Sequence, residues 1–251
     1  MPVEERTVPA EVGDLWVSLL GPDPYPRLRQ IFGELYRPNS GAAGVVSGPW
    51  MHLVDKRGGI RFSALVYKPE GGPVQVRAMY PYTESGYLWP VAVSVAERSP
   101  TGIASVLGRV GPVPVGLFDT LPFKGPYREE PERFQVSAVA LRLDPEALDR
   151  DRFSDDFAAC APVRRDPRDT SVPADVMEVH SRVDAVEAAS FWGVPLTRYL
   201  LTLARPPGEP LTLDVYANDA QVGRRYAPGD RVSGFVWVFG FRPDPGWSGA
   251  P

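Results

Sequence analysis

The chain of 251 residues is poor in the residue types on which many active sites depend. Cys160 is its one cysteine, so no disulfide can form within the chain and no cysteine cluster can bind a metal. The two histidines, His52 and His180, have no cysteine at ligand spacing, which argues against a zinc site. We therefore predict a protein with no metal and no cofactor.

Lysine and long apolar runs are also scarce. Lys56, Lys68 and Lys124 are the only lysines, arginine supplies the remaining positive charge, and the net charge is −4. A chain of this charge has no bulk attraction to nucleic acid or to an anionic membrane. No apolar run reaches the roughly 18 residues that a membrane span needs. We expect no membrane partner, and nucleic acid is disfavoured.

The single thiol suits a reducing cytoplasm. The start of the chain, MPVEERTVPAEV, is acidic and lacks the basic residues and the apolar run of a signal peptide. Arginine in place of lysine, with abundant Ala, Gly, Pro and Val, is typical of a GC-rich bacterial genome. These features predict a cytoplasmic bacterial protein.

Proline and glycine, at 29 and 24 residues, are well above average, and they separate short apolar runs. Such punctuation is typical of turns between many strands. The runs predict strands at 50–54, 60–67, 74–80, 88–96, 102–110, 113–118, 134–143, 176–188, 196–204, 211–217 and 232–241. We found no repeat of fixed period, although both halves contain strand-rich segments of comparable size.

Helical signals are confined to two places. Apolar residues recur at helical spacing within residues 8–36, which predicts a pair of helices packed on the protein's own sheet. Asp144 followed by Pro145 has the form of a helix N-cap and first helical position, which predicts a helix toward Phe157.

The predicted fold is mainly β, with two antiparallel barrel- or sandwich-like units and an N-terminal helical segment. Residues 1–48 form the helical segment packed on the first β unit, and residues 49–157 form an antiparallel β domain. Residues 158–174 are polar and contain proline, as in a linker. Residues 175–251 form the second β domain. The alternative is a single intertwined α+β domain.

The last strand, 232–241, is apolar on both faces and should therefore be covered on both. One face carries the rings of Phe235, Trp237, Phe239 and Phe241, and Tyr216 lies on the neighbouring strand. If exposed, these rings would form a stacking platform for bases or sugars; if buried, they would form core or an oligomer interface. Tyr216, Phe235, Trp237 and Phe239 are thus the candidate ligand-binding residues.

The run from Asp175 to Phe241 is similar to the strand order of an OB-type barrel, with a turn at Trp192-Gly193 and a Pro228-Gly229-Asp230 turn before the last strand. The resemblance covers about a quarter of the chain. It implies a small closed sheet of the kind that binds oligonucleotides or oligosaccharides. No fifth strand follows in the sequence, so the N-terminal half would have to supply it, making the two halves one intertwined unit.

Catalytic candidates are few. His180, Asp184 and Glu187 lie on one predicted strand and could form a His/carboxylate site of a hydrolase in a cleft between the β units. Cys160 precedes Arg164, and nearby cations can activate a thiol, but neither histidine can be placed beside it. No serine-nucleophile motif of the G-x-S-x-G or S-x-x-K type occurs.

The sequence therefore favours a non-enzymatic binding or protein-interaction module, with an unknown protein partner or a second copy of the chain as its ligand. Two other classes stay open. One is a hydrolase-like enzyme that uses His180 with Asp184 or Glu187. The other is an OB module that binds single-stranded nucleic acid or an oligosaccharide.

Overall fold

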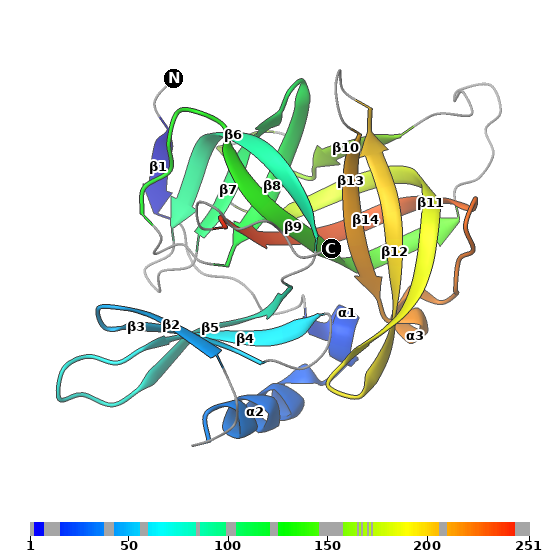
Figure 1. The fold of residues 1–251 in the computed structure, drawn as a ribbon. Coiled ribbons are helices and arrows are strands. Elements are labelled where there is room, and N and C mark those ends of the chain that lie inside the picture. Colours follow the sequence, from blue (N-terminus) through cyan, green and yellow to red (C-terminus); the bar gives the residue numbers. More distant parts are fainter. Residues whose placement is uncertain are drawn as a thin grey trace.

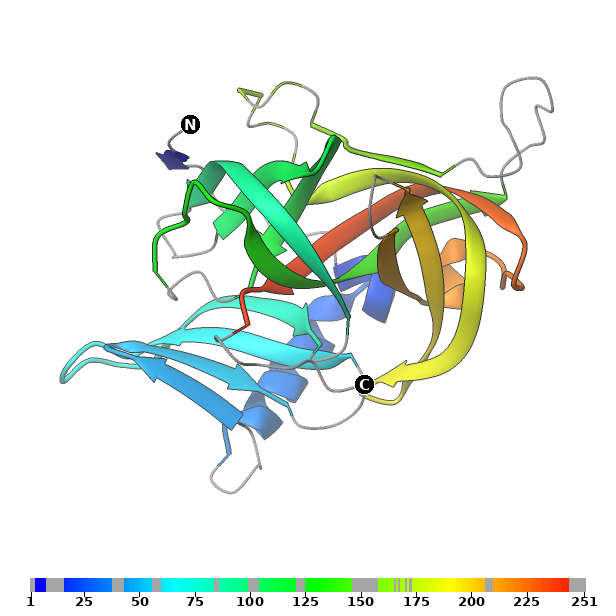
Figure 2. The same ribbon diagram turned by 45° about the horizontal axis from the view of Figure 1, so that its top comes forward.

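A computed structural model describes most of the chain (Figures 1 and 2). The described residues are 3–7, 16–37, 43–55, 60–83, 86–98, 104–120, 125–145, 158–164, 166, 168–169, 171, 173–205 and 210–243. The fold is mainly β, with two sheets and a short helical segment near the N-terminus, as the alternating pattern predicts.

A four-stranded antiparallel sheet with two helices makes up the N-terminal part. The strands are β2 (Ala43–Ser47), β3 (Trp50–Val54), β4 (Arg61–Tyr67) and β5 (Gln75–Tyr82), and the helices are α1 (Val17–Leu20) and α2 (Pro24–Leu35). The fixed φ of Pro24 suits the first turn of α2. Leu28, Ile31 and Leu35 recur on its buried face and share a core cluster with Phe62 of β4. Of the predicted helical region 8–36, residues 8–15 lie outside the described residues.

The second sheet has ten strands. They are β1 (Glu4–Thr7), β6 (Tyr87–Arg98), β7 (Ala104–Val110), β8 (Val113–Asp119), β9 (Glu132–Pro145), β10 (Ala159–Pro162), β11 (Val176–Phe191), β12 (Val194–Ala204), β13 (Leu211–Ala217) and β14 (Arg231–Phe241). The short helix α3 (Asp219–Val222) connects β13 to β14.

The predicted start of a helix at Asp144 is wrong. Asp144 and Pro145 are the last residues of β9 and lie opposite Ser233 and Val232 of β14. Pairing with a long neighbouring strand outweighs the local helix signal at this point, and residues 146–157 lie outside the described residues.

The strand pairings of the ten-stranded sheet close into two rings of five strands. One ring runs β6, β7, β8, β14, β9 and back to β6; the other runs β11, β12, β13, β9, β14 and back to β11. The β9–β14 ladder belongs to both rings. In Figure 1 these two strands cross the middle of the sheet, with β6–β8 on one side and β11–β13 on the other.

The two rings repeat one structural unit. β6, β7, β8 and β9 take in the first ring the places that β11, β12, β13 and β14 take in the second, with the same parallel and antiparallel pairings. The first strand of each set also pairs irregularly with the next at one point. That point lies between Val93 and Val95 in β6 and between Val183 and Ala185 in β11. Each ring is therefore completed by a strand from the other half of the chain.

The segment predicted to be a linker, 158–174, holds the first ring to the second. It begins with β10, which pairs with β11. Arg164 then forms a buried ion pair with Glu97 of β6, and Ala174 packs in a small apolar cluster on β6 and β7. The strands on either side of this segment share one sheet, so residues 158–174 do not separate two sheets.

The aromatic face of β14 is largely buried. Trp237, Phe239 and Tyr216 are at most 1% exposed, and Phe235, near the start of the strand, is 37% exposed. The ring of Trp16, which directly precedes α1, lies 6.5 Å from that of Trp237. The N-terminal helices and the four-stranded sheet share one core cluster with this face, while Val232, Val236 and Val238 fill the interior of the rings.

We expect Gly116→Ala to lower the free energy of unfolding by about 1–3 kcal/mol. A Cβ atom at Gly116 of β8 would lie 1.8 Å from the carbonyl oxygen of Ala174, so the segment could not stay in place. Urea unfolding measures the loss. Gly33→Ala is the matched control: its Cβ meets no heavy atom within 4 Å, and within α2 it should raise stability by about 0.5–1 kcal/mol. An unchanged unfolding midpoint for Gly116→Ala would contradict the docking of the segment.

Candidate binding surface on β11, β12 and β13

Two of the predicted catalytic residues lie on the outer face of the second ring, and the third does not join them. Asp184 and Glu187 belong to the part of β11 that pairs with β12. His180 belongs to the part that pairs with β10 and β14, and its Nε2 lies 3.4 Å from Glu178 Oε1. Four residues along a strand separate His180 from Asp184 by about 13 Å. The two side chains cannot form an acid–base pair in this arrangement.

Arg198 of β12 is the centre of this outer face. Its Nε and Nη2 donate hydrogen bonds of 2.9 and 3.0 Å to the two carboxylate oxygens of Asp214 on β13. Its Nη1 donates at 2.7 Å to Glu187 Oε2 on β11. Such a two-pronged contact fixes the guanidinium plane. One arginine therefore ties three neighbouring strands together.

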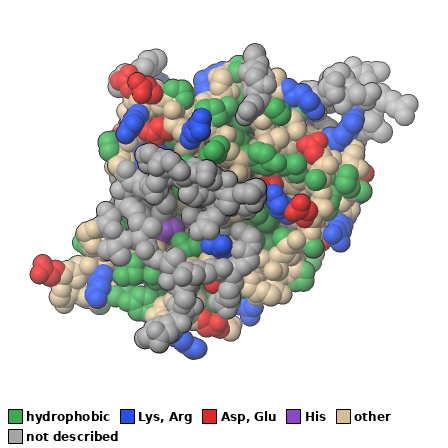
Figure 3. Space-filling view, in the orientation of Figure 1, with side chains coloured by type: hydrophobic (Ala, Val, Ile, Leu, Met, Phe, Trp, Pro, Cys, Tyr) green, Lys and Arg blue, Asp and Glu red, His purple; other side chains and the backbone are tan. Residues whose placement is uncertain are grey.

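A second contact continues the polar strip. Thr202 Oγ1 of β12 donates at 2.8 Å to Asp184 Oδ2. Tyr87, at the start of β6, lies close enough to the strip that Asp214 contributes to its pKa. We name these residues the β11–β13 surface: Tyr87, Asp184, Ala185, Glu187, Arg198, Leu200, Thr202 and Asp214. In Figure 3, acidic and basic side chains lie next to one another over β12 and β13, with hydrophobic side chains around them.

Burial and charge shape the ionisation of this surface. The side chain of Asp214 is 1% exposed, and burial raises its pKa although Arg198 opposes the shift. Burial also disfavours the charge of Arg198, but the hydrogen bonds from Arg198 to Asp214 and the negative charge of that carboxylate raise the pKa of the guanidinium overall. Burial, followed by the charge of Asp214, raises the pKa of Tyr87. Arg198 is thus held charged and rigid.

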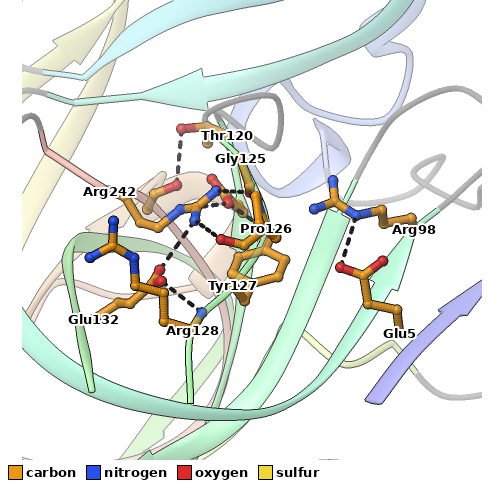
Figure 4. A network of polar contacts seen from close by, with 11 residues as sticks. Glu5, Arg98, Thr120, Gly125, Pro126, Tyr127, Arg128, Glu132 and Arg242 are labelled. Atoms are coloured by element: carbon orange, nitrogen blue, oxygen red, sulfur yellow. Dashed lines mark hydrogen bonds and ion pairs between the residues drawn. The ribbon is translucent and has the colours of Figure 1, made fainter. Parts of the chain in front are cut away.

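Arg242 is the centre of a second polar network, at the end of β14 (Figure 4). Its guanidinium donates to the carbonyl oxygens of Gly125 and Pro126 at 2.9 and 3.2 Å and to Glu132 at 3.2 Å. Tyr127 donates at 2.8 Å to the buried carboxylate of Asp119. The contacts of Arg242 hold residues 125–132 at the end of β14, and Tyr127 ties the same stretch to Asp119 of β8.

The other predicted candidates are not arranged for chemistry. Burial raises the pKa of the Cys160 thiol to about 12, which keeps it protonated and unreactive. Of the predicted stacking residues, Phe235 alone is substantially exposed, because Tyr216, Trp237 and Phe239 are core residues. Within the described residues no cluster of His, Cys, Asp and Glu is arranged to hold a metal ion.

Arg198, Asp214 and Tyr87 were not among the residues predicted from the sequence. A signal for one of them was present: the alternation of the LTLDVYA strand places Asp214 on the polar face. The partner of Asp214 could not be predicted from the sequence, because the register of β12 against β13 is what sets Arg198 within reach of Asp214. Tyr87 is distant in sequence and reaches this surface through the contact between β6 and β13.

Comparison with known proteins gives no match to a family model, a curated protein or a solved structure. None of the helices among the described residues has the length and apolarity to cross a membrane.

Arg198→Met should lower the free energy of unfolding at pH 7 by about 3 kcal/mol, because it leaves the carboxylate of Asp214 buried without its guanidinium. The unpaired Asp214 has a raised pKa in the folded protein. The folded state then binds a proton that the unfolded state has lost, and stability falls as pH rises above about 4.

The loss caused by Arg198→Met should therefore be smallest near pH 4, as measured by urea unfolding across a pH series. The double variant Arg198→Met/Asp214→Leu should recover most of the loss, since no charge stays buried. A double variant as unstable as Arg198→Met alone would show that Asp214 is not the group the arginine compensates.

Proposed function

We propose that the chain is a non-enzymatic binding module of the bacterial cytoplasm and that it contacts a protein partner through the β11–β13 surface. The observation that supports this is the position of Arg198, held rigid at the centre of a half-exposed sheet face beside Tyr87. Arginine and tyrosine are the residues that most often dominate protein interfaces, and a preorganised arginine loses little entropy on binding.

The hydrogen-bond partners of the candidate groups support binding over catalysis. The carboxylate of Asp214 accepts two hydrogen bonds from Arg198, and Asp184 and Glu187 each accept one. A general base needs a basic group within reach of a proton to be removed. His180 lies beside Glu178 and not beside these groups. The hydrolase alternative therefore has no assembled His/carboxylate pair on this surface.

The topology supports a ligand-binding role for the outer face of these strands. The fifth strand that an OB-type arrangement of residues 175–241 requires is β9, which pairs with β13 and β14. OB-type barrels use the face of their second and third strands for binding, and β12 and β13 take those places here. The excess of carboxylates on the surface favours a protein partner over phosphate-bearing nucleic acid.

The test is site-specific photo-crosslinking in an extract of the native host. A benzophenone amino acid at Leu200, on the β11–β13 surface, should give a discrete partner band that Glu187→Lys removes. The same probe at Val76, an exposed residue of the four-stranded sheet, is the control and should not give that band. Equal bands from both positions, or none from Leu200, would overturn the assignment of the surface. A band with the mass of two chains would identify a second copy as the partner.

A separate assay addresses the enzyme alternative. The purified chain should show no turnover with ester, amide and phosphoester substrates, and His180→Ala should leave the crosslink at Leu200 unchanged. Turnover that His180→Ala abolishes would refute the non-enzymatic role.

A further inference from the structure

The outer faces of the two rings correspond residue by residue. The strand register and the matching irregularities in β6 and β11 fix the correspondence. In this register the outer residues Val95, Glu97, Leu107 and Gly116 of the first ring match Ala185, Glu187, Leu200 and Asp214 of the second. What is bound on the first face therefore indicates what the second can bind.

The first face is covered by the chain itself. Ala174 packs on Val95 and Leu107, and its carbonyl oxygen lies against Gly116. Arg164, ten residues earlier, forms an ion pair with Glu97 in which both side chains are 3% exposed. The chain thus covers this face with the connection between β10 and β11, which turns at Asp166–Asp169 and contributes one arginine and one small side chain.

No described segment of the chain covers the corresponding face of the second ring. Glu187, the counterpart of Glu97, is 63% exposed in its side chain, and Ala185 and Leu200 are partly exposed. Arg198 approaches Glu187 from the neighbouring strand but is also shared with Asp214. With Asp184 nearby, the β11–β13 surface has three carboxylates and one guanidinium, so it complements a positive charge.

The edge of β6 next to this surface is open among the described strands. Next to the first face, β10 pairs antiparallel with β11 from Met177 to His180 before the chain reaches Arg164. The counterpart of that stretch is Tyr87–Pro90 of β6, which pairs with β9 along one edge. In the described part of the chain no strand pairs with its other edge. A strand could be added there, as in peptide recognition by sheet edges.

We propose that the β11–β13 surface binds a segment of a partner protein, a short strand followed by a turn, that carries an arginine or lysine and a small side chain. The segment adds to the edge of β6 at Tyr87–Pro90, its cation pairs with Glu187, and its small residue packs on Ala185 and Leu200. This inference rests on the proposed binding function and specifies its ligand. The chain's own residues 159–175 are the intramolecular counterpart of that ligand.

The test uses a synthetic peptide with the sequence of residues 159–175, capped at both ends, fluorescently labelled and with Cys160 replaced by serine. Three arginines balance three aspartates in this peptide, so bulk charge does not drive its binding. The chain's own segment occupies the first face at a high effective concentration, so added peptide binds on the second. Fluorescence anisotropy should show saturable binding.

Glu187→Lys should lower the affinity for the peptide at least tenfold, and Arg164→Glu in the peptide should lower it by a similar factor. The two changes combined should restore binding, because the charges are exchanged across one contact. Glu70→Lys, at an exposed turn of the four-stranded sheet, makes the same charge change elsewhere and should leave affinity unchanged. Urea unfolding of each variant verifies that it folds.

Two results would overturn the inference. One is a loss of peptide affinity in Glu70→Lys as large as that in Glu187→Lys, and the other is no peptide binding by the wild-type chain. The crosslink at Leu200 distinguishes a failure of the proposed ligand from a failure of the proposed binding function. A partner captured there without peptide binding refutes the ligand chemistry but keeps the binding function, whereas loss of both refutes both.

Discussion

The β9–β14 ladder is the interaction on which the rest of the structure depends. Each strand of this pair completes one ring and takes part in the other, so its backbone hydrogen bonds and both of its faces are used. On β14 the valines fill the rings, and the aromatic side chains need a second cover, which the N-terminal helices and the small sheet provide. A strand buried on both sides therefore explains why three parts of the chain pack around it.

The two rings differ in what covers their outer faces. The rings have the same pairing, but one outer face is closed by the segment that connects the halves, with Arg164 held by Glu97. On the other face, Arg198 of the neighbouring strand β12 pairs with Glu187 in place of an arginine from a covering segment, and Glu187 stays exposed. One outer face of this repeated framework is occupied and the other is open among the described residues, and the open face is where we propose the binding role.

Much of the fold could be predicted from the sequence, because local patterns determine it. Alternation and Gly/Pro turns locate the strands, and the two apolar faces of 232–241 predict a central, covered position. The resemblance to an OB-type barrel implied a further strand from the N-terminal half, and β9 pairs with β13 and β14 of the C-terminal half. The error at Asp144 has the opposite cause, since its cap-like sequence is overruled by distant pairing with Ser233.

The candidate surface could be predicted only in part. Asp184 and Glu187 were found because one strand carries both, but their partners lie on other strands, and contacts between strands depend on register. The repeat was hidden for a related reason. The two units share a pattern of pairing and not of residues: where one has Gly116, the other has Asp214.

The exchange of strands between the rings has a consequence for how such a chain could arise. A single unit of four strands would expose the unpaired edge of its last strand, and two copies could cover that edge by each completing the other's ring. The resulting homodimer would have the two rings and the shared ladder seen here. Joining two such copies end to end, through a segment like 158–174, would turn a symmetric dimer into one chain whose two faces were free to diverge.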